Sequence, residues 1–231
     1  LEAARLSGRA TGIISTSEFM HATPTDFTAH DPSRASYDNL TEQIVYNKLD
    51  VILGGGIKYL KPESRKDKED MAAILKSRGY SIVGNTAELE QFSGKKLVGV
   101  FGKTDKHTAL SYDLDRDPAR EPSLAQMTSK AIEVLSKQPK GFFLMVEGSK
   151  VDWAAHANDP VGILSDVLAF DKAVGVALDF AKKNGNTLVV AVSDHGNSGI
   201  SIGDRSTSTT YDKTPWTSFI DPLKKAKVTG E

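Results

Sequence analysis

Short apolar runs alternate with helix-like stretches along most of the 231 residues, and this alternation constrains the fold more than any other feature of the sequence. Two parallel strands need a long crossover between them, which is usually a helix. The repeated order of strand and helix therefore favours an α/β fold with a mainly parallel sheet. We expect strands at residues 11–16, 50–56, 80–84, 97–101, 141–148 and 186–195.

The two longest apolar runs predict the centre of this sheet. GFFLMVEG (141–148) and NTLVVAVSDH (186–195) are nearly all apolar, as expected of strands that are covered on both faces. A helix over 162–183 connects them and closes at Asn184-Gly185, a natural left-handed cap, so a right-handed crossover is expected. Further helices are expected at residues 1–6, 40–48, 68–78, 86–92 and 123–137, with a long polar loop at 17–34.

The composition excludes several classes of protein. Lys and Arg total 29 against 30 Asp and Glu, so the net charge of −1 gives no field that would attract nucleic acid. No run approaches the roughly 18 apolar residues of a membrane span, and no signal peptide opens the chain. The absence of cysteine excludes disulfides, thiolate zinc sites and a cysteine nucleophile. We expect one soluble domain over 1–231, with a polar surface excursion at 102–121, and the composition leaves its compartment open.

Glu147, Asp152 and His156 form the strongest group of residues that can carry chemistry. Glu147 ends a predicted buried strand, and an Asp-x-x-x-His pair follows it within nine residues. On a helix, Asp152 and His156 share one face and offer the oxygen and nitrogen ligands that zinc accepts. The pair alone is explained equally well by a surface histidine and an aspartate that caps a helix.

Asp194 and His195 form a second group, directly after the predicted strand LVVAVS and before a glycine-bearing turn. Ligands gather at the carboxyl ends of parallel strands, so both groups are expected at one edge of one sheet. Burying either residue without a partner would be costly, which argues against a purely structural role. Together the two groups predict adjacent cation sites, as two-metal hydrolysis requires.

The early polar loop supplies further candidates. Arg34 offers a planar donor fork suited to two oxygens of a phosphate, and Thr23 offers a hydroxyl suited to magnesium. A lone arginine in such a loop is more often a surface charge. We assign no catalytic role to His30, which is expected to support the loop near Arg34, to His107, or to the glycine run at 54–56, which is expected to form a tight turn.

These segments in combination resemble the alkaline phosphatase family. STSEFMHATPTDFTAHDPSR, DVILGGG, FFLMVEGSKVDWAAHAND and NTLVVAVSDHGNSG occur in the family order and at family-like spacing. The resemblance implies a three-layer α/β/α sandwich around a mainly parallel sheet, two zinc ions and one magnesium ion or other divalent metal in the intact enzyme. It also implies small phosphomonoester substrates, release of inorganic phosphate through a phosphoserine intermediate, an extracellular or periplasmic location and often a homodimer.

The resemblance also implies a role for each matched position. Asp152 and His156 resemble ligands of the first zinc, and Asp194 and His195 resemble ligands of the second. Glu147 and Thr23 resemble ligands of the third cation, and Arg34 resembles the clamp on two phosphate oxygens. His21 replaces an aspartate near the third cation and Trp153 replaces a lysine near the phosphate, when compared with the enterobacterial pattern. Because imidazole is softer than carboxylate, we expect looser metal selectivity at the third site.

Three family residues have no counterpart in this sequence. The chain contains no Asp-Ser pair for the nucleophile, no early bridging aspartate, and no histidine after His195. We therefore expect a fragment truncated at both ends, with each metal site one ligand short, partial or no metal occupancy, and little or no activity alone. Other enzymes of the superfamily, such as a phosphodiesterase or sulfatase, and a non-catalytic metal- or phosphate-binding protein remain as alternatives.

Overall fold

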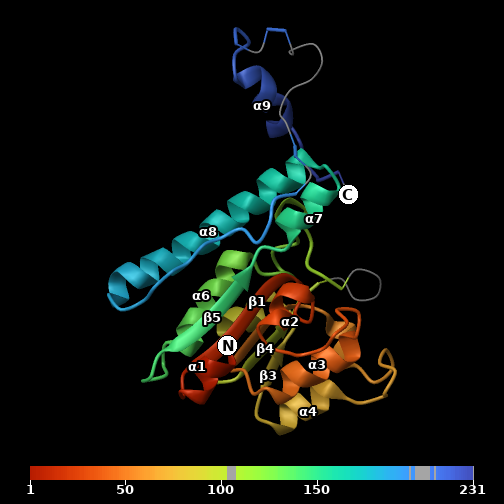
Figure 1. Ribbon diagram of the computed structural model, residues 1–231, viewed down its shortest axis with the longest axis vertical. Coiled ribbons are helices and arrows are strands. Elements are labelled where there is room, and N and C mark those ends of the chain that lie inside the picture. Colours follow the sequence, from red (N-terminus) through yellow and green to blue (C-terminus); the bar gives the residue numbers. More distant parts are fainter. Residues whose placement is uncertain (103–107, 198, 201–208, 211, 231) are drawn as a thin grey trace.

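The computed structural model describes residues 1–102, 108–197, 199–200, 209–210 and 212–230. Its centre is a parallel sheet in the order β3-β4-β2-β1-β5 (Figure 1). The fold class predicted from the alternating pattern is therefore confirmed. The strands are β1 (Ala10–Glu18), β2 (Val51–Gly55), β3 (Ser81–Val83), β4 (Leu97–Val100) and β5 (Phe142–Glu147).

Helices cover both faces of this sheet and make it the middle of three layers. Neighbouring residues of β1 point to opposite sides, because side chains alternate along a strand. Ile13 packs into a core with residues of α3 and α4, whereas Ile14 packs into a second core with residues of α6. Both side chains are fully buried. A helix layer on each side of the sheet therefore accounts for the burial of both faces of β1.

The helices agree with the sequence pattern within a few residues. α6 begins with a capping box in which Ser123 and Gln126 bond each other's backbone. α8 begins at the Asp159 cap with a proline in its first turn, and ends at Gly185 in the left-handed conformation expected there. The α-helices are α1 (Glu2–Leu6), α2 (Ala22–Asp26), α3 (Tyr37–Tyr46), α4 (Met71–Ser77), α5 (Thr86–Gln91), α6 (Leu124–Leu135), α7 (Lys150–His156), α8 (Pro160–Asn184) and α9 (Thr217–Lys224).

The strand predicted over residues 186–195 is wrong. This stretch is extended without strand pairing, and it leaves Leu188, Val190 and Val192 between 69% and 86% exposed. Apolar β-branched residues match the composition of a buried strand, but a strand forms only where a neighbour accepts its backbone hydrogen bonds. β5 was also predicted for the centre of the sheet, and this too is wrong: it is the edge strand of the described sheet, paired with β1, and of its residues only Met145 is buried. The predicted crossover through α8 is therefore not completed by a strand.

Two loop predictions have clear structural outcomes. The polar loop at 17–34 contains the short helix α2, which sequence analysis did not anticipate. The tight turn expected over the glycine run at 54–56 forms only at Gly56, which has φ of 106°, because Gly54 and Gly55 still belong to β2. A Cβ on Gly55 would lie 2.1 Å from the Thr108 carbonyl oxygen. Only glycine fits so close an approach of two backbones.

Part of the segment expected as a surface excursion is buried. Leu110 and Tyr112 are at most 5% exposed, and Glu121 is 3% exposed with its carboxylate accepting from the Ser111 N–H (2.9 Å). Residues 103–107, including His107, lie outside the described residues.

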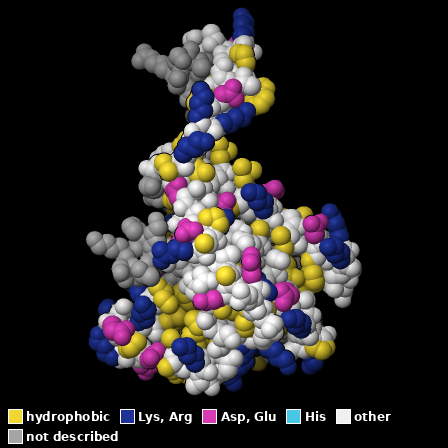
Figure 2. All heavy atoms as spheres, turned by 180° about the vertical axis from the view of Figure 1, so that it is seen from behind, with side chains coloured by type: hydrophobic (Ala, Val, Ile, Leu, Met, Phe, Trp, Pro, Cys, Tyr) yellow, Lys and Arg dark blue, Asp and Glu magenta, His cyan; other side chains and the backbone are white. Residues whose placement is uncertain are grey.

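The C-terminal part of the chain carries α9 away from the body of the molecule (Figure 1). The chain then returns to the body, where both the N–H and hydroxyl of Thr229 bond the Asp115 carboxylate and the N–H of Gly230 donates to Asp159 Oδ2 (2.8 Å). Figure 2 shows lysine and arginine side chains gathered over this projecting segment. Among the helices that the structure describes, none has the length and apolar character to cross a membrane.

Candidate active site

The site lies where β1 and β5 end side by side, because Ser15 pairs with Glu147 in their parallel register. Serine side chains then join the two segments that follow. Ser149 Oγ lies 3.0 Å from Ser17 Oγ and accepts from the Ser17 N–H (3.2 Å). These contacts fasten the first turn of α7 to the end of β1, and so fix the helix that carries Asp152 and His156.

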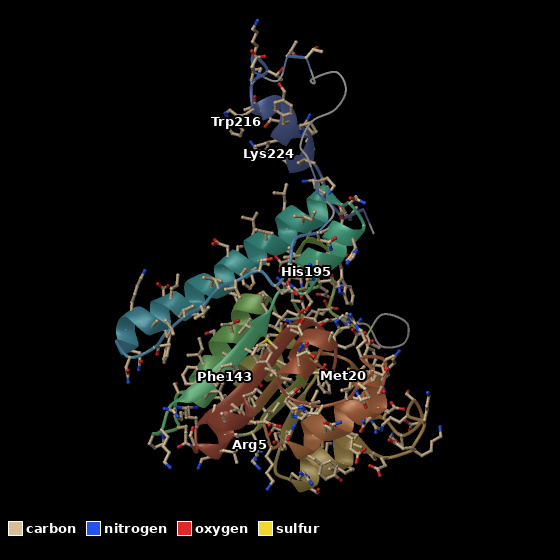
Figure 3. All side chains as sticks on the ribbon, in the orientation of Figure 1. Arg5, Met20, Phe143, His195, Trp216 and Lys224 are labelled. Atoms are coloured by element: carbon tan, nitrogen blue, oxygen red, sulfur yellow. The ribbon has the colours of Figure 1, made fainter. Side chains whose placement is uncertain are left out.

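Asp152 lies at the centre of the candidate metal ligands. Its Oδ2 is 3.6 Å from His156 Nε2, one helical turn further along α7. Its Oδ1 is 3.8 Å from Nε2 of His195, whose same nitrogen is 3.4 Å from Asp194 Oδ2. Figure 3 shows His195 beside α7. Although the strand before Asp194 and His195 is absent, the two predicted couples meet at one place.

Asn197 also belongs to this site and was missed from the sequence. Its Nδ2 donates to Asp152 Oδ1 (2.8 Å) and lies 3.3 Å from the Asp152 carbonyl oxygen. The contact ties the segment after His195 to α7. The signal in the sequence was the place of Asn197 in the glycine-bearing turn after Asp194 and His195. Residues in loops next to a site commonly reach into it.

Glu147 carries a buried carboxyl group whose pKa is shifted by its surroundings. Burial raises the pKa of Glu147, hydrogen bonds from the Ser149 and Thr23 side chains lower it, and the nearby Asp194 and Asp152 charges raise it further. Its Oε2 is buried and has no hydrogen-bond partner among the residues that the structure describes. A carboxylate oxygen that is buried, unsatisfied and close to two other carboxylates is the electrostatic arrangement that a cation would relieve.

Arg34, His21 and Trp153 form a neighbouring group. Arg34 Nη2 lies 3.5 Å from His21 Nε2, and the His21 ring meets the Trp153 ring edge to face at 5.6 Å between centroids. Burial and the Arg34 charge lower the pKa of His21, against smaller opposite effects of Glu18 and Asp152. The neutral imidazole that this favours can accept from the guanidinium. Arg34 is itself exposed, which leaves its donor fork accessible to a ligand.

His30 lies away from this group. The backbone N–H of His30 donates to Gln43 Oε1 (2.8 Å), and its ring atom Nε2 lies 3.1 Å from Glu2 Oε1. The histidine supports the loop through Gln43 as expected, but its ring faces α1 instead of Arg34.

Comparison with known proteins decides the family. The alkaline phosphatase family model matches residues 1–224. The chain belongs to the alkaline phosphatase family. It is 42% identical over 209 residues to alkaline phosphatase 4 of Bacillus subtilis, a match that covers 88% of this chain and 43% of the relative. Alkaline phosphatase 3 of the same organism is 40% identical, with 100% of this chain and 48% of the relative covered.

Solved alkaline phosphatases share the fold. The crystal structure of the Thermus thermophilus enzyme superposes with a TM-score of 0.87 at 31% identity, covering 99% of this chain and 47% of that chain. A histidine-to-aspartate variant of the enzyme from the Antarctic bacterium TAB5, with magnesium bound in a site called M3, has a TM-score of 0.65 at 32% identity. That match covers 79% of this chain and 51% of that one. The present chain thus spans about half the length of the alkaline phosphatases it matches.

The residues present fit the divalent metals that alkaline phosphatases bind, but they do not close around an ion. Carboxylate and imidazole donors suit zinc, and the carboxylate of Glu147 with the hydroxyl of Thr23 suits magnesium. The orphaned Oε2 of Glu147 supports the fit. Within the described ranges, however, no three His, Asp or Glu side chains are arranged to hold one ion. The donors are gathered at the sheet edge without the geometry of a finished site.

Proposed function

We propose that this chain supplies the metal and phosphate site of a metal-dependent phosphomonoester hydrolase that releases inorganic phosphate. The observation that carries the proposal is the meeting of His156 and His195 on the two oxygens of Asp152. Membership of the alkaline phosphatase family supports the reaction class. The phosphoserine intermediate, the metals and the activity of the whole protein belong to this proposal.

Asp152 with His156 would hold the first zinc, and Asp194 with His195 the second. Glu147 with Thr23 would hold the third cation, magnesium or another divalent metal. When bound, these cations neutralise phosphate oxygens and lower the pKa of coordinated hydroxyl groups. The shared position of Asp152 between the two histidines supports two neighbouring ions instead of one.

Arg34 would bind the phosphoryl group of the substrate. Its planar guanidinium group can donate to two phosphate oxygens at once, and its positive charge attracts the negative charge of the transferring phosphoryl group. His21 lies against the guanidinium and Trp153 lies against His21, so both would border the phosphate. Since recognition by these residues addresses the phosphoryl group, the alcohol of the ester can vary.

His21 would loosen the metal selectivity of the third site. Imidazole is a softer ligand than carboxylate, so a histidine beside this site favours transition metals over magnesium. The TAB5 enzyme variant in which an aspartate replaces a histidine, with magnesium at M3, supports this proposal.

The nucleophile, the location and the assembly of the whole enzyme rest on family membership. The sequence has no Asp-Ser pair, so we place the serine that would carry the phosphoryl group outside these 231 residues. We expect the purified chain alone to be inactive or nearly so. An extracellular or periplasmic location and a homodimer are proposed for the whole protein by analogy with its family.

Zinc titration of the purified chain tests the proposal. Asp152→Asn should weaken zinc binding at least about tenfold, because it removes the carboxylate shared by both histidines. Asp171→Asn, an exposed aspartate on α8, is the matched control and should leave the affinity unchanged. Equal zinc affinities for the two variants would contradict the site. In the whole protein, Asp152→Asn should abolish most hydrolysis of p-nitrophenyl phosphate.

A further inference from the structure

Lys150 occupies an unusual place for a lysine. It lies in the first turn of α7 and is only 7% exposed. Its Nζ lies 4.0 Å from the centroid of the Trp153 ring and 4.6 Å from that of Tyr112. We propose that Lys150 is a positioning residue, which holds the Trp153 indole in the orientation that faces His21 and the phosphate site.

The contact with two aromatic faces has a physical basis. A cation over an indole is attracted by the negative face of the ring, and the attraction grows when water is excluded. Tyr112, from the segment before the 3-10 helix η2 (Asp113–Asp115), covers the ammonium group from a second direction. Asp166 of α8 lies close enough to Lys150 for the lysine charge to lower the pKa of its carboxyl group. Three separate elements therefore determine where the ammonium group lies.

Trp153 is fixed from two sides. Lys150 and Trp153 are three residues apart on α7 and so share one face of the helix. On another side, the indole meets the His21 ring at 5.6 Å with an interplanar angle of 62°. The base of α7 is fixed as well, since the Lys150 N–H donates to Thr16 Oγ1 (3.1 Å) at the end of β1. The indole cannot swing toward solvent without leaving the cation.

The consequence for catalysis rests on the proposed function. Lys150 lies against the Trp153 ring, so we expect it to act on the substrate through the orientation of Trp153. A less well-oriented indole would weaken binding of the phosphoryl group more than it would slow the chemical step. In the whole enzyme, Lys150→Met should therefore raise KM several-fold with a smaller change in kcat.

Fluorescence tests the positioning role without any requirement for activity. Trp153 and Trp216 are the two tryptophans of the chain, so Trp216→Phe leaves Trp153 as the sole indole fluorophore. In that background, Lys150→Met should raise the acrylamide quenching constant of Trp153 about twofold, because the cation contact is lost. Lys150→Arg keeps a cation and should restore the parent value. Lys182→Met, an exposed lysine on α8, should change nothing.

A quenching constant that is the same in Lys150→Met as in the parent would overturn the proposal. So would an increase that Lys150→Arg fails to reverse, since that result would indicate general loosening of α7. A phosphatase-inactive whole protein with the predicted fluorescence pattern would instead contradict the proposed function and leave the Lys150 contact intact.

A measurement on the unsubstituted lysine guards against variants that fail to fold. Ring currents of Trp153 and Tyr112 should shift the ε-methylene protons of Lys150 upfield of those of the other lysines. Replacing Trp153 with leucine should move this resonance part of the way back, with Tyr112 providing the remainder. If no lysine ε-methylene resonance is displaced in the parent chain, Lys150 does not lie on these rings.

Discussion

His21 precedes α2, two residues before Thr23, and the Thr23 side chain bonds the Glu147 carboxyl group. The oxygen atoms of Glu147 and Thr23 suit magnesium. Replacing His21 with aspartate adds a hard, charged oxygen ligand of the kind magnesium prefers. We predict that His21→Asp raises the magnesium affinity of the protein about tenfold and lowers its preference for zinc at the third site. Titration calorimetry with each metal, followed by metal analysis of the purified protein, measures both effects.

His21→Asn is the matched control, since it keeps a polar side chain of similar size without adding charge. It should leave magnesium binding weak. Pure magnesium occupancy beside the unsubstituted His21, in the presence of equal zinc, would be incompatible with the argument from ligand softness.

At the scale of elements, the junction of α8 with η2 contains a carboxyl group that should make stability depend on pH. Asp166 is 5% exposed, and its Oδ2 accepts from the Asp113 N–H (3.2 Å). Burial raises the pKa of Asp166 to about 7. That N–H and the Lys150 charge lower it, while the Asp113 and Asp115 charges raise it. At about 1.4 kcal/mol per pKa unit, ionising this group in the folded chain costs on the order of 4 kcal/mol.

The folded chain should therefore lose stability as pH rises through about 7. The pKa of this carboxyl group is higher in the folded chain than in the unfolded chain. Its protonated form therefore stabilises the fold fully below the unfolded pKa of about 4, and this stabilisation is lost as pH rises through the folded pKa. Urea unfolding at pH 5 and pH 8 measures the difference. Asp166→Asn still accepts a hydrogen bond, and it should reduce the difference in unfolding free energy between pH 5 and pH 8 by at least half. If the variant and the parent show the same difference, Asp166 ionises freely in the folded chain.

The extended stretch at 186–195 allows a second test at this scale. Val190 is 69% exposed, so Val190→Lys should change the free energy of unfolding by less than about 0.5 kcal/mol. Ile13, fully buried in β1, provides the contrast: Ile13→Ala should cost about 2–5 kcal/mol. Denaturant melts of both variants decide whether the stretch is a buried strand. A cost above about 1 kcal/mol for Val190→Lys would restore the strand that the sequence predicted.

The same stretch shows which features the sequence could predict. β1 to β5 were located because their burial depends on local pattern and on crossover helices within the chain. Residues 186–195 have the same pattern, but strand formation also requires an available neighbour, which no local pattern specifies. In the site, the Asp152/His156 spacing was readable as one helical turn. The contacts of Asn197 with Asp152 and of Lys150 with Tyr112 join segments distant in sequence, so periodicity could not reveal them.

At the scale of the whole molecule, several large apolar side chains are exposed on neighbouring segments of the chain, and such groups of exposed apolar residues mark surfaces that associate. The residues that contribute to this surface come from α8 and from the extended stretch that follows it. On α8, the apolar residues Leu164, Val167, Leu168 and Leu178 are between 42% and 59% exposed, and Leu188, Val190 and Val192 are exposed in the stretch. The chain spans about half the length of the relatives it matches.

We predict that the purified chain self-associates through the apolar side of α8. Leu168→Glu should weaken association at least about tenfold. Burying one leucine contributes about 1.5–3 kcal/mol to the free energy of association, and burying a carboxylate in its place is unfavourable. Sedimentation velocity over a range of concentrations measures the association constant. Leu6→Glu, on the distant helix α1, is the control, because Leu6 is 79% exposed but lies outside this surface. A chain that stays monomeric at high concentration, or equal weakening by both variants, would locate the association elsewhere.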